Sequence, residues 1–311
     1  MPSIRGDLSA ALFFSTMPRV ALVTSSKYPD LTDDDRLLLR PLAERGINAE
    51  ATIWDDPACD WPSFDAVILR SCWDYHLNCE AFLRWIALLE QAKTPVWNSA
   101  PLVRWNANKS YLRDLEANGI SIVPTYWPEA GDGVRLREKL HELGWMKAVV
   151  KPRVSATAHR TQLIAADDAD SVQELFGELQ RGPGAMVQKF MRGVVTEGEW
   201  SVIFLGGKYS HAVLKMAKAG DFRVQSDFGG TDRAAEPPAH VLQSAIHIVQ
   251  TVEPTLYARV DGVVDDGQFR LIELELIEPA LFLASHPAAP SGFADAIAAT
   301  VYPRSRRVAD R

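Results

Sequence analysis

The sequence has few cysteines, and their spacing does not form a disulfide framework or a zinc site. It contains three, Cys59, Cys72 and Cys79, among 311 residues, with no CxxC pair. An odd, small number of cysteines without paired spacing argues against a disulfide scaffold and against structural zinc. We therefore expect a cytoplasmic protein, kept in a reducing compartment.

Long apolar runs are also missing. No run approaches the roughly 20 residues that a membrane-spanning helix requires. The apolar patch in MPSIRGDLSAALFFST, residues 1–16, is too brief for the core of a signal peptide. A strand begins directly after it in MPRVALVT, so we expect an unstructured extension over 1–16 and a natural start at Met17. We expect no membrane partner.

The chain lacks a long basic segment. Its formal net charge is −7, whereas nucleic-acid affinity depends on clustered Lys and Arg. The short basic stretch of Arg304, Arg306 and Arg307 is interpreted as a frayed tail, residues 304–311. We expect no nucleic-acid partner.

What remains is an ordinary globular composition, with 47% hydrophobic and 23% charged residues, and a length that predicts two or three domains. Between residues 17 and about 105, β-branched runs alternate with helical segments. This alternation predicts an α/β domain with a parallel sheet. The expected strands are 19–26, 47–54, 64–71 and 94–100, and the expected helices are 33–46 and 78–93.

After residue 105 the pattern changes to α+β. Helices are expected over 106–119, 168–181 and 239–254, with successive strands and glycine turns between them. The layout is therefore a small parallel α/β domain followed by a larger antiparallel α+β part.

The segment LIELELIEP, residues 271–279, places acidic residues in a run that otherwise has the pattern of a buried strand. Alternate strand residues share a face, so Glu273 and Glu275 point the same way. The preceding strand, YARVDGVV, is joined to it through DDGQ. A loop with an odd number of residues, or a bulge, puts Asp261 across from Glu273 and Arg259 near Glu275. A strict two-residue turn would shift the register by one and place Asp261 on the opposite face. We predict the odd loop or bulge.

In that register Asp261, Glu273 and Glu275 form a carboxylate cluster, and such neighbours repel unless they are neutralised. One possibility is that they face solvent and pair with Arg259. Three converging carboxylates beside a core strand favour a metal site instead. Oxygen ligands without Cys or His nearby indicate Mg²⁺ or Mn²⁺, usually together with substrate phosphates. Glu278 has the opposite parity and is not expected to be a ligand.

Phosphate binding requires cations. Lys151 ends a strand in VVKP and Lys109 precedes a helix; either alone would be interpreted as a surface lysine. The loop after Lys151, PRVSATAHRT, could cover a triphosphate through backbone N–H groups and the hydroxyl of Ser155 or Thr157. It lacks glycine, and the chain contains neither a Walker A sequence nor a GxGxxG after the first strand.

The order of these motifs resembles the ATP-grasp ligases. Lys109 is followed by VVKP with its small-residue loop, then by VQKFMRGVVTEGEWSVIFLGGKYSHAVLK, GDFRVQSDFGG, RVDGVV and LIELELIEP. The likeness covers roughly residues 95–285 and is greatest to the glutathione-synthetase and ribosomal-protein-S6-modifying group. ELELIEP, with RSCWDYH upstream, resembles the subgroup of the cycloserine-forming ligase. The implied fold is a pre-ATP-grasp α/β domain over 17–105, a central lobe over 106–185 and a C-terminal lobe over 186–303.

The resemblance also implies site residues. Those for the nucleotide are Lys109, Lys151 and Ser155 at the phosphates, Gln188, Lys189 and Phe190 at adenine, and Glu199 at the ribose. Metal binding is implied for Asp261, Glu273 and Glu275, with Mg²⁺ or Mn²⁺. Catalytic roles are implied for Arg223, at the acyl-phosphate and its tetrahedral successor, for Lys215, at the γ-phosphate, and for Arg259. Substrate contact is implied for Gln225, Gly229 and Gly230.

Two departures from the family pattern stand out. The loop over the phosphates is usually glycine-rich, and here His159 or Arg160 could substitute. The third metal position is commonly Asn and here is Glu275, which could tighten the metal site or touch a cationic group of the substrate.

RSCWDYH ends the third strand of the N-terminal domain, at the carboxyl edge where open parallel sheets bind ligands. Substrate candidates there are Arg70, Trp73, Asp74 and Tyr75. A purely structural interpretation is equally open, in which Trp73 and Tyr75 pack under the next helix and Asp74 lies near its start. His211 is expected to be a core residue, and His286 is left open.

The implied reaction is attack of a carboxylate on the γ-phosphate of ATP, followed by attack of an amine on the acyl-phosphate. The substrates are expected to be small and amino-acid-like. An intermolecular ligase competes with an intramolecular, cycloserine-forming type of cyclase. A non-catalytic nucleotide-binding module is disfavoured by Lys151, Arg223 and the carboxylates, and a ligase acting on an acidic peptide tail is disfavoured by the acidic composition. Homodimers are common in the family, and no sequence feature decides the oligomeric state.

Overall fold

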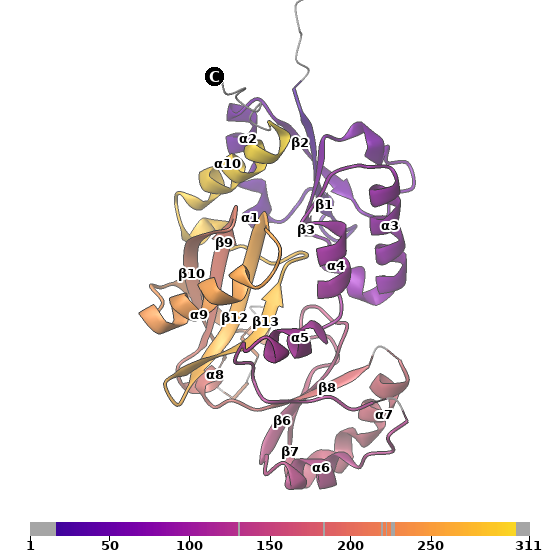
Figure 1. The fold of residues 1–311 in the computed structure, drawn as a ribbon, viewed down its shortest axis with the longest axis vertical. Coiled ribbons are helices and arrows are strands. Elements are labelled where there is room, and N and C mark those ends of the chain that lie inside the picture. The colour runs from indigo at the N-terminus through magenta and orange to yellow at the C-terminus, as the bar shows by residue number, and fades with distance from the viewer. Residues whose placement is uncertain are drawn as a thin grey trace, which may run out of the picture.

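The computed structural model describes residues 17–129, 131–182, 184–218, 220–221, 223–224 and 228–302. The expected extension 1–16, the expected tail 304–311 and the substrate candidate Gln225 lie outside the described residues. Three sheets organise the chain, and Figure 1 shows them stacked along the long axis of the molecule. None of the helices in the described ranges is long and apolar enough to cross a membrane.

The N-terminal domain contains the predicted parallel sheet, in the order β2-β1-β3-β4. Its strands are β1 (Arg19–Thr24), β2 (Asn48–Ile53), β3 (Ala66–Ser71) and β4 (Val96–Trp97). The larger helices are α3 (Cys79–Gln91) and α4 (Ala100–Asn106), with short 3-10 turns η1 (Trp61–Ser63) and η2 (Tyr75–Asn78). Strands β1 and β3 are almost wholly buried, as their β-branched composition predicts.

The helix predicted over 33–46 is broken into α1 (Asp33–Arg36) and α2 (Leu39–Glu44). Thr32 caps α1 by accepting from the backbone N–H of Asp35 at 3.2 Å. Pro41 explains the break, because its ring clashes with the carbonyl of residue 37 in a continuous helix. Gly46 follows α2 with a φ of 70°, the left-handed conformation that stops a helix and favours glycine.

The central lobe contains the antiparallel sheet β5-β8-β6-β7. Its strands are β5 (Thr125–Tyr126), β6 (Lys147–Pro152), β7 (Gln162–Ala165) and β8 (Ala185–Lys189), and its helices are α5 (Tyr111–Ala117), α6 (Leu136–Glu142), η3 (Ala166–Val172) and α7 (Gln173–Arg181). Strand β8 belongs to this sheet, so the sheet continues to Lys189, beyond the boundary predicted at residue 185. The helix predicted over 106–119 is confined to α5.

The C-terminal lobe is built on the antiparallel sheet β11-β10-β9-β12-β13. Its strands are β9 (Glu199–Leu205), β10 (Lys208–Met216), β11 (Thr231–Ala234), β12 (Tyr257–Asp265) and β13 (Gln268–Glu275). The helices are α8 (Gly193–Thr196), α9 (Ala239–Gln250), η5 (Leu283–Ser285) and α10 (Ala289–Val301). Helices α5 and α9 supply side chains to the core cluster under this sheet.

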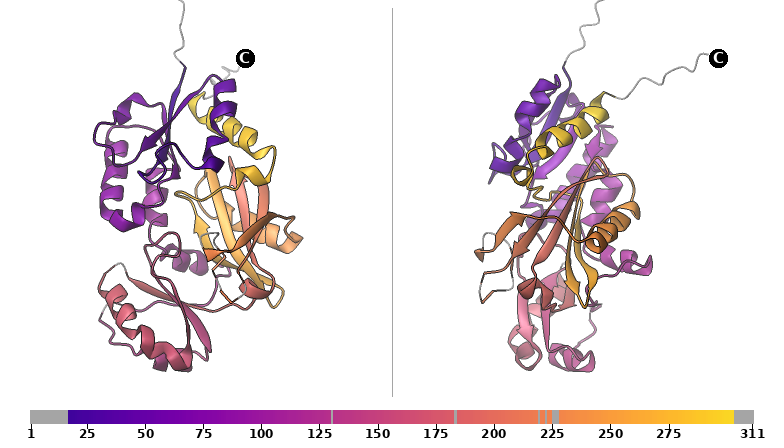
Figure 2. Two further views of the ribbon diagram at one scale, coloured as in Figure 1. Left: turned by 180° about the vertical axis from the view of Figure 1, so that it is seen from behind. Right: turned by 90° about the vertical axis from the view of Figure 1, so that its left-hand side faces the viewer.

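The N-terminal domain and the C-terminal lobe share one hydrophobic core. This core contains Val20 and Ile68 of the parallel sheet, Tyr257 of β12 and Phe293 of α10. Figure 2 shows the yellow helix α10 packed alongside the indigo segments of the N-terminal domain. The shared core fixes the carboxyl end of β3 against the chain that leaves β13.

The register of the last hairpin is as predicted. Asp261 lies opposite Glu273 and Arg259 lies opposite Glu275, with a bulge between Asp261 and Gly262. The bulge keeps Arg259 and Asp261 on the face of the two glutamates. A Cβ at Gly262 would lie 2.2 Å from the Phe269 ring and 2.7 Å from the Arg270 carbonyl oxygen, so glycine is required at this position.

Replacing Gly262 by alanine should lower the free energy of unfolding by about 1–3 kcal/mol, because the new methyl group overpacks against a ring and a backbone carbonyl. Thermal denaturation of the full chain measures the loss. Gly292→Ala on α10 is the matched control, since a Cβ there meets nothing within 4 Å. Equal melting temperatures for the two variants would contradict the steric role of Gly262.

Candidate functional site

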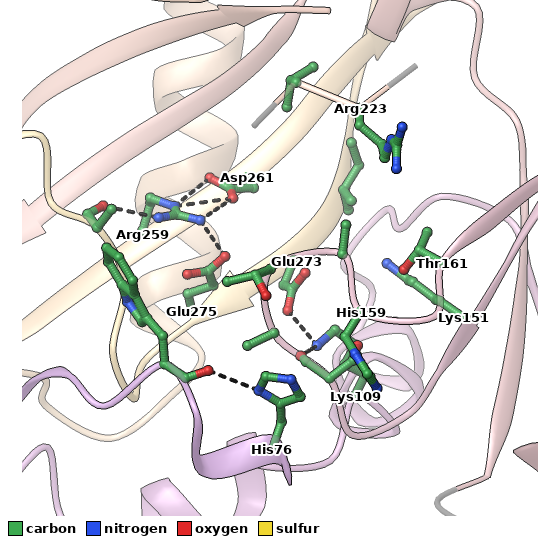
Figure 3. A pocket seen from close by; sticks show the side chains of 18 of the residues that line it. His76, Lys109, Lys151, His159, Thr161, Arg223, Arg259, Asp261, Glu273 and Glu275 are labelled. Carbon is green, nitrogen blue, oxygen red and sulfur yellow. Dashed lines mark hydrogen bonds and ion pairs between the residues drawn. The ribbon is translucent and has the colours of Figure 1, made fainter. Parts of the chain in front are cut away.

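One cavity of about 590 Å³ lies where the three parts of the chain meet. Its walls come from the carboxyl end of the parallel sheet, from β6, β8 and the 153–161 loop of the central lobe, and from β9, β10, β12 and β13. The volume falls in the range typical of small-molecule sites, about 300–1,000 Å³. Most of the predicted site residues line it, and Figure 3 shows the acidic residues of β12–β13 facing Lys109 and Lys151.

Asp261 is buried and fully engaged by neighbouring donors. Arg259 donates through Nε to Oδ1 at 3.0 Å and through Nη2 to Oδ2 at 2.9 Å. Lys215 Nζ lies 3.2 Å from Oδ2, and Ser201 on β9 also donates to Oδ1. Burial opposes ionisation, but the charges of Arg259 and Lys215 and these hydrogen bonds outweigh it and lower the pKa of Asp261 to about 2.

Glu273 is paired with Lys109, whose Nζ lies 2.9 Å from Oε1. The Lys109 ammonium also donates to the carbonyl oxygen of Ser155. Burial acts against the Glu273 carboxylate, yet Lys109 and Lys151 together lower its pKa below the usual value. The backbone N–H of Lys109 donates to the Arg153 carbonyl at 2.8 Å, which ties the lysine to the loop over the cavity.

Glu275 forms an ion pair with Arg259, the partner predicted from the hairpin register. Burial has the largest effect on the pKa of Glu275 and raises it. Arg259 lowers this pKa, Asp261 and Glu273 raise it further, and the result is a pKa of about 7. Arg259 Nη1 also donates to the Ala280 carbonyl at 3.0 Å. The carboxylate face is therefore neutralised by protein cations.

The predicted three-carboxylate metal cluster is not assembled in this arrangement. Within the described ranges, no group of three His, Cys, Asp or Glu residues has the geometry to hold a metal ion. Both oxygens of Asp261 accept protein donors. The ion pairs of Glu273 and Glu275 use Oε1 in each case, so their Oε2 atoms are the donors suited to a hard cation such as Mg²⁺. The chemistry of the donor set fits Mg²⁺ through these two glutamates.

Lys151 lies at the end of β6 and lines the cavity. It is buried, and it makes no salt bridge with the part of the chain that the structure describes. Burial is the main cause that lowers its pKa, with Lys109 adding to the effect and Glu273 opposing it. In Figure 3 no dashed line reaches Lys151, whereas Lys109 is bonded to Glu273.

The loop that follows Lys151 lacks glycine but adopts the backbone conformation that glycine favours. Thr157, Ala158 and Arg160 have φ values of 51°, 56° and 54°. Ser155 is buried and lines the cavity, as predicted. His159 also lines it, 5.2 Å from the ring of His76 across the cavity mouth, whereas Arg160 pairs with Glu178 of α7 outside it. Of the two predicted substitutes for glycine, only His159 faces the site.

The residues predicted to hold adenine and ribose all line the cavity, but the ribose candidate Glu199 is paired with a protein cation. Gln188, Lys189 and Phe190 follow each other at the end of β8. Glu199 is buried and lies 2.5 Å from Lys215, so it pairs with a protein cation. Lys215 is held between Glu199 and Asp261, which encloses the ammonium predicted to support a phosphate.

Arg70 is not a substrate residue. It is 1% exposed, its Nε lies 2.9 Å from Asp35 Oδ1, and its Nη2 donates to the Pro279 carbonyl at 2.8 Å. It does not line the cavity. Its guanidinium lies instead in the shared core, 5.0 Å from the Tyr257 ring, where it joins three segments through buried polar contacts.

Two neighbouring candidates do reach the cavity. Trp73 donates from Nε1 to the Glu278 carbonyl at 2.8 Å, and Asp74 accepts from Trp54 Nε1 at 3.0 Å; both line the cavity wall. Tyr75 lines it too but is buried with its ring 5.0 Å from that of Phe82, the packing role predicted as its second possibility.

Some of the remaining predicted positions reach the cavity and others do not. Arg223 lines the cavity, bonded to Asp221 and stacked 3.7 Å over the Phe228 ring. Gly229 and Gly230 do not line it. His211 is a buried residue bonded to the Leu281 carbonyl at 2.9 Å, as predicted, and His286 stacks on it.

Glu278 is a cavity residue whose position strand parity did not predict. It lines the wall and is 9% exposed. Strand parity placed it on the far side, but β13 ends at Glu275 and the chain then turns toward the N-terminal domain. Pro279 was the available signal, because proline interrupts strand pairing and makes parity unreliable beside it.

Comparison with known proteins identifies the family of the chain. The profile described as the N-terminal domain of D-cycloserine synthetase DcsG matches residues 20–98. The cycloserine biosynthesis protein DcsG of Streptomyces lavendulae is 30% identical over 306 residues, which cover 91% of this chain and 99% of DcsG. The chain belongs to the D-cycloserine synthetase family of ATP-grasp ligases.

The solved structures agree with that assignment. The crystal structure of D-cycloserine synthetase DcsG superposes with a TM-score of 0.81 at 28% identity, covering 91% of this chain and 99% of DcsG. D-alanine–D-alanine ligase from Bacillus anthracis shares the fold, with a TM-score of 0.67 at 16% identity and coverage of 91% and 97%. So does the ATP-grasp ligase PsnB in complex with Mg and ADP, with a TM-score of 0.64 at 19% identity and coverage of 92% and 99%. This member of the D-cycloserine synthetase family is an ATP-dependent carbon–nitrogen ligase.

Proposed function

We propose that this ligase is an intramolecular cyclase, which activates the carboxylate of a small amino-acid-like substrate with ATP and closes it onto a nitrogen of the same molecule. The observation that carries this proposal is the similarity to DcsG along almost the whole chain, including the N-terminal domain. That domain supplies the cavity wall at Trp73 and Asp74.

For the nucleotide, Lys151 is the residue whose environment most requires an anion. It is a buried cation that makes no salt bridge within the described ranges, and the γ-phosphate of ATP would supply a close counter-charge. Lys109 would share its ammonium between Glu273 and a phosphate, and Ser155 and the backbone N–H groups of the left-handed 157–160 loop would line the other side. These groups stabilise charge that develops on the transferring phosphoryl group.

For the metal, Glu273 and Glu275 would hold Mg²⁺ through their Oε2 oxygens. When bound, the ion neutralises phosphate charge during the transfer. Asp261 would support the site through Arg259, which it shares with Glu275. Lys215 keeps Asp261 ionised and positioned, so we assign it to the support of the carboxylate face. Arg223 would approach the acyl-phosphate from the opposite wall.

The experiment is a phosphate-release assay on the purified full chain with single amino-acid-like substrates, followed by mass spectrometry. Cyclisation should release one phosphate per product and give a product lighter than its substrate by one water. If release instead requires a carboxylate and a separate amine together, the enzyme is an intermolecular ligase. Phosphate release that no substrate stimulates would favour a nucleotide-binding module.

A further inference from the structure

Nearly every buried charge in the described ranges has an opposite charge beside it. Asp35 pairs with Arg70, and Lys109 pairs with Glu273. Lys215 pairs with both Glu199 and Asp261. Arg259 also pairs with Asp261. The buried charged residues without a salt bridge, among those the structure describes, are Lys151 and Glu278. Both line the cavity. A lysine and a glutamate without salt bridges in the described ranges therefore line the same space.

Glu278 is held in place by its backbone. Its carbonyl oxygen accepts from Trp73 Nε1 at 2.8 Å, and the next carbonyl, of Pro279, accepts from Arg70 at 2.8 Å. Both donors belong to the carboxyl end of β3 and the turn after it, which the shared core fixes against the C-terminal lobe. The carboxylate is thus presented by a rigid junction rather than by a loose loop.

The surroundings of Glu278 contain no cation to neutralise it within the part of the chain that the structure describes. On the N-terminal domain, Glu278 acts on Cys72, Tyr75 and Cys79, whose pKa values burial and its charge raise, so these groups stay uncharged. Lys109 attracts it from a distance but is already bonded to Glu273 and Ser155. Burial first, and then the charge of Glu275, raise the pKa of Glu278 to about 8.

Such an environment is unfavourable for an isolated carboxylate and is relieved by a bound cation. The metal is proposed for Glu273 and Glu275, which leaves Glu278 for a different cation. A substrate ammonium does fit. The triphosphate would satisfy Lys151 at one end of the cavity, and the substrate would extend toward Trp73 at the other.

We infer that Glu278 binds the cationic amino group of the substrate and selects amino-bearing carboxylates over analogues that lack the amine. This inference rests on the proposed function. It adds a specificity contact between the N-terminal domain and the segment after β13, separate from the phosphate-binding lysines. The acidic residue at Glu275 is neutralised by Arg259, so the possibility that Glu275 meets the substrate cation is less favoured than Glu278.

The test compares two probes that differ only in the amine, D-cycloserine and isoxazolidin-3-one, by isothermal titration of the full chain with ADP and Mg²⁺. The wild-type chain should bind the amine-bearing probe about 10- to 100-fold more tightly, as expected for a hydrogen-bonded ion pair. Glu278→Gln should bind both probes with the same affinity to within about twofold. Glu116→Gln, which removes the same charge from the exposed side of α5, should keep the wild-type preference.

The melting temperature of each variant is measured in parallel. Glu278→Gln removes no salt bridge within the described ranges, so its melting temperature should be unchanged or higher. A fall of several degrees would show that the carboxylate supports the fold, and retained preference for the amine would show that it does not touch the amine; either result overturns the inference. The titration needs no turnover. If the chain prefers the amine-bearing probe but releases phosphate only when two substrates are present, the results would contradict cyclisation and still support amine binding by Glu278.

Discussion

Lys151→Met should lower kcat/KM for ATP-dependent phosphate release by about 10²–10³-fold, the loss typical when one preorganised donor to a developing charge is removed. The ammonium is buried in the cavity and makes no salt bridge with the described residues, and we assign a phosphate as its partner. Methionine keeps the length and apolar stem of lysine. The measurement is steady-state phosphate release at varied ATP.

The same variant should be as stable as the wild type or more stable. An unpaired buried ammonium destabilises the free protein, and methionine removes that cost. Lys147→Met, on the exposed start of the same strand, is the control and should change neither activity nor melting temperature. If Lys151→Met melted several degrees lower, the ammonium would be a structural element, and the assignment to phosphate would be wrong.

Glu273→Gln should abolish the effect of Mg²⁺ on nucleotide binding and reduce turnover by more than about 100-fold, because residues outside the first coordination shell already contribute up to that factor. The substitution keeps the shape of the side chain but removes the charge next to Lys109. Titration of ADP with and without Mg²⁺ measures the metal effect independently of turnover.

This variant should also lose some stability. Lys109 would remain buried near Lys151 without its carboxylate, and we expect the free energy of unfolding to fall by about 1–3 kcal/mol while the fold is kept. Glu174→Gln, on the exposed side of α7, is the matched control. Undiminished tightening of ADP binding by Mg²⁺ in Glu273→Gln would contradict the metal assignment.

These predictions share one physical basis, the balance of charge in the cavity. Three cations, Lys109, Lys215 and Arg259, neutralise the carboxylate face and hold it in one geometry. Within the described ranges, Lys151 and Glu278 are the buried charged residues without a salt bridge, and we assign both to ligands. Lys109 pairs with Glu273 and Glu275 pairs with Arg259, and these residues would also meet the nucleotide or its metal, so charge pairing points to two of the ligand contacts and not to all of them.

Local patterns of the sequence were sufficient to predict the parallel sheet and the register of the last hairpin. The alternation of β-branched runs and helices is a local property, and it predicted the parallel sheet. Placing Asp261 opposite Glu273 required only the two-residue period of a strand and a bulge, both confirmed. The break at Pro41 was also visible in the sequence, in a residue whose helix-breaking effect was overlooked.

The sequence by itself determined the family, the parallel α/β domain followed by an antiparallel α+β part, and the set of polar residues that could meet at one site. Only the tertiary structure decided which of them pair with each other. Arg70 and Asp35 are far apart in the chain and meet in the core, while Glu278 reaches the cavity because the chain turns after β13. Ion pairing depends on distances between segments brought together by packing, and no local period encodes those distances.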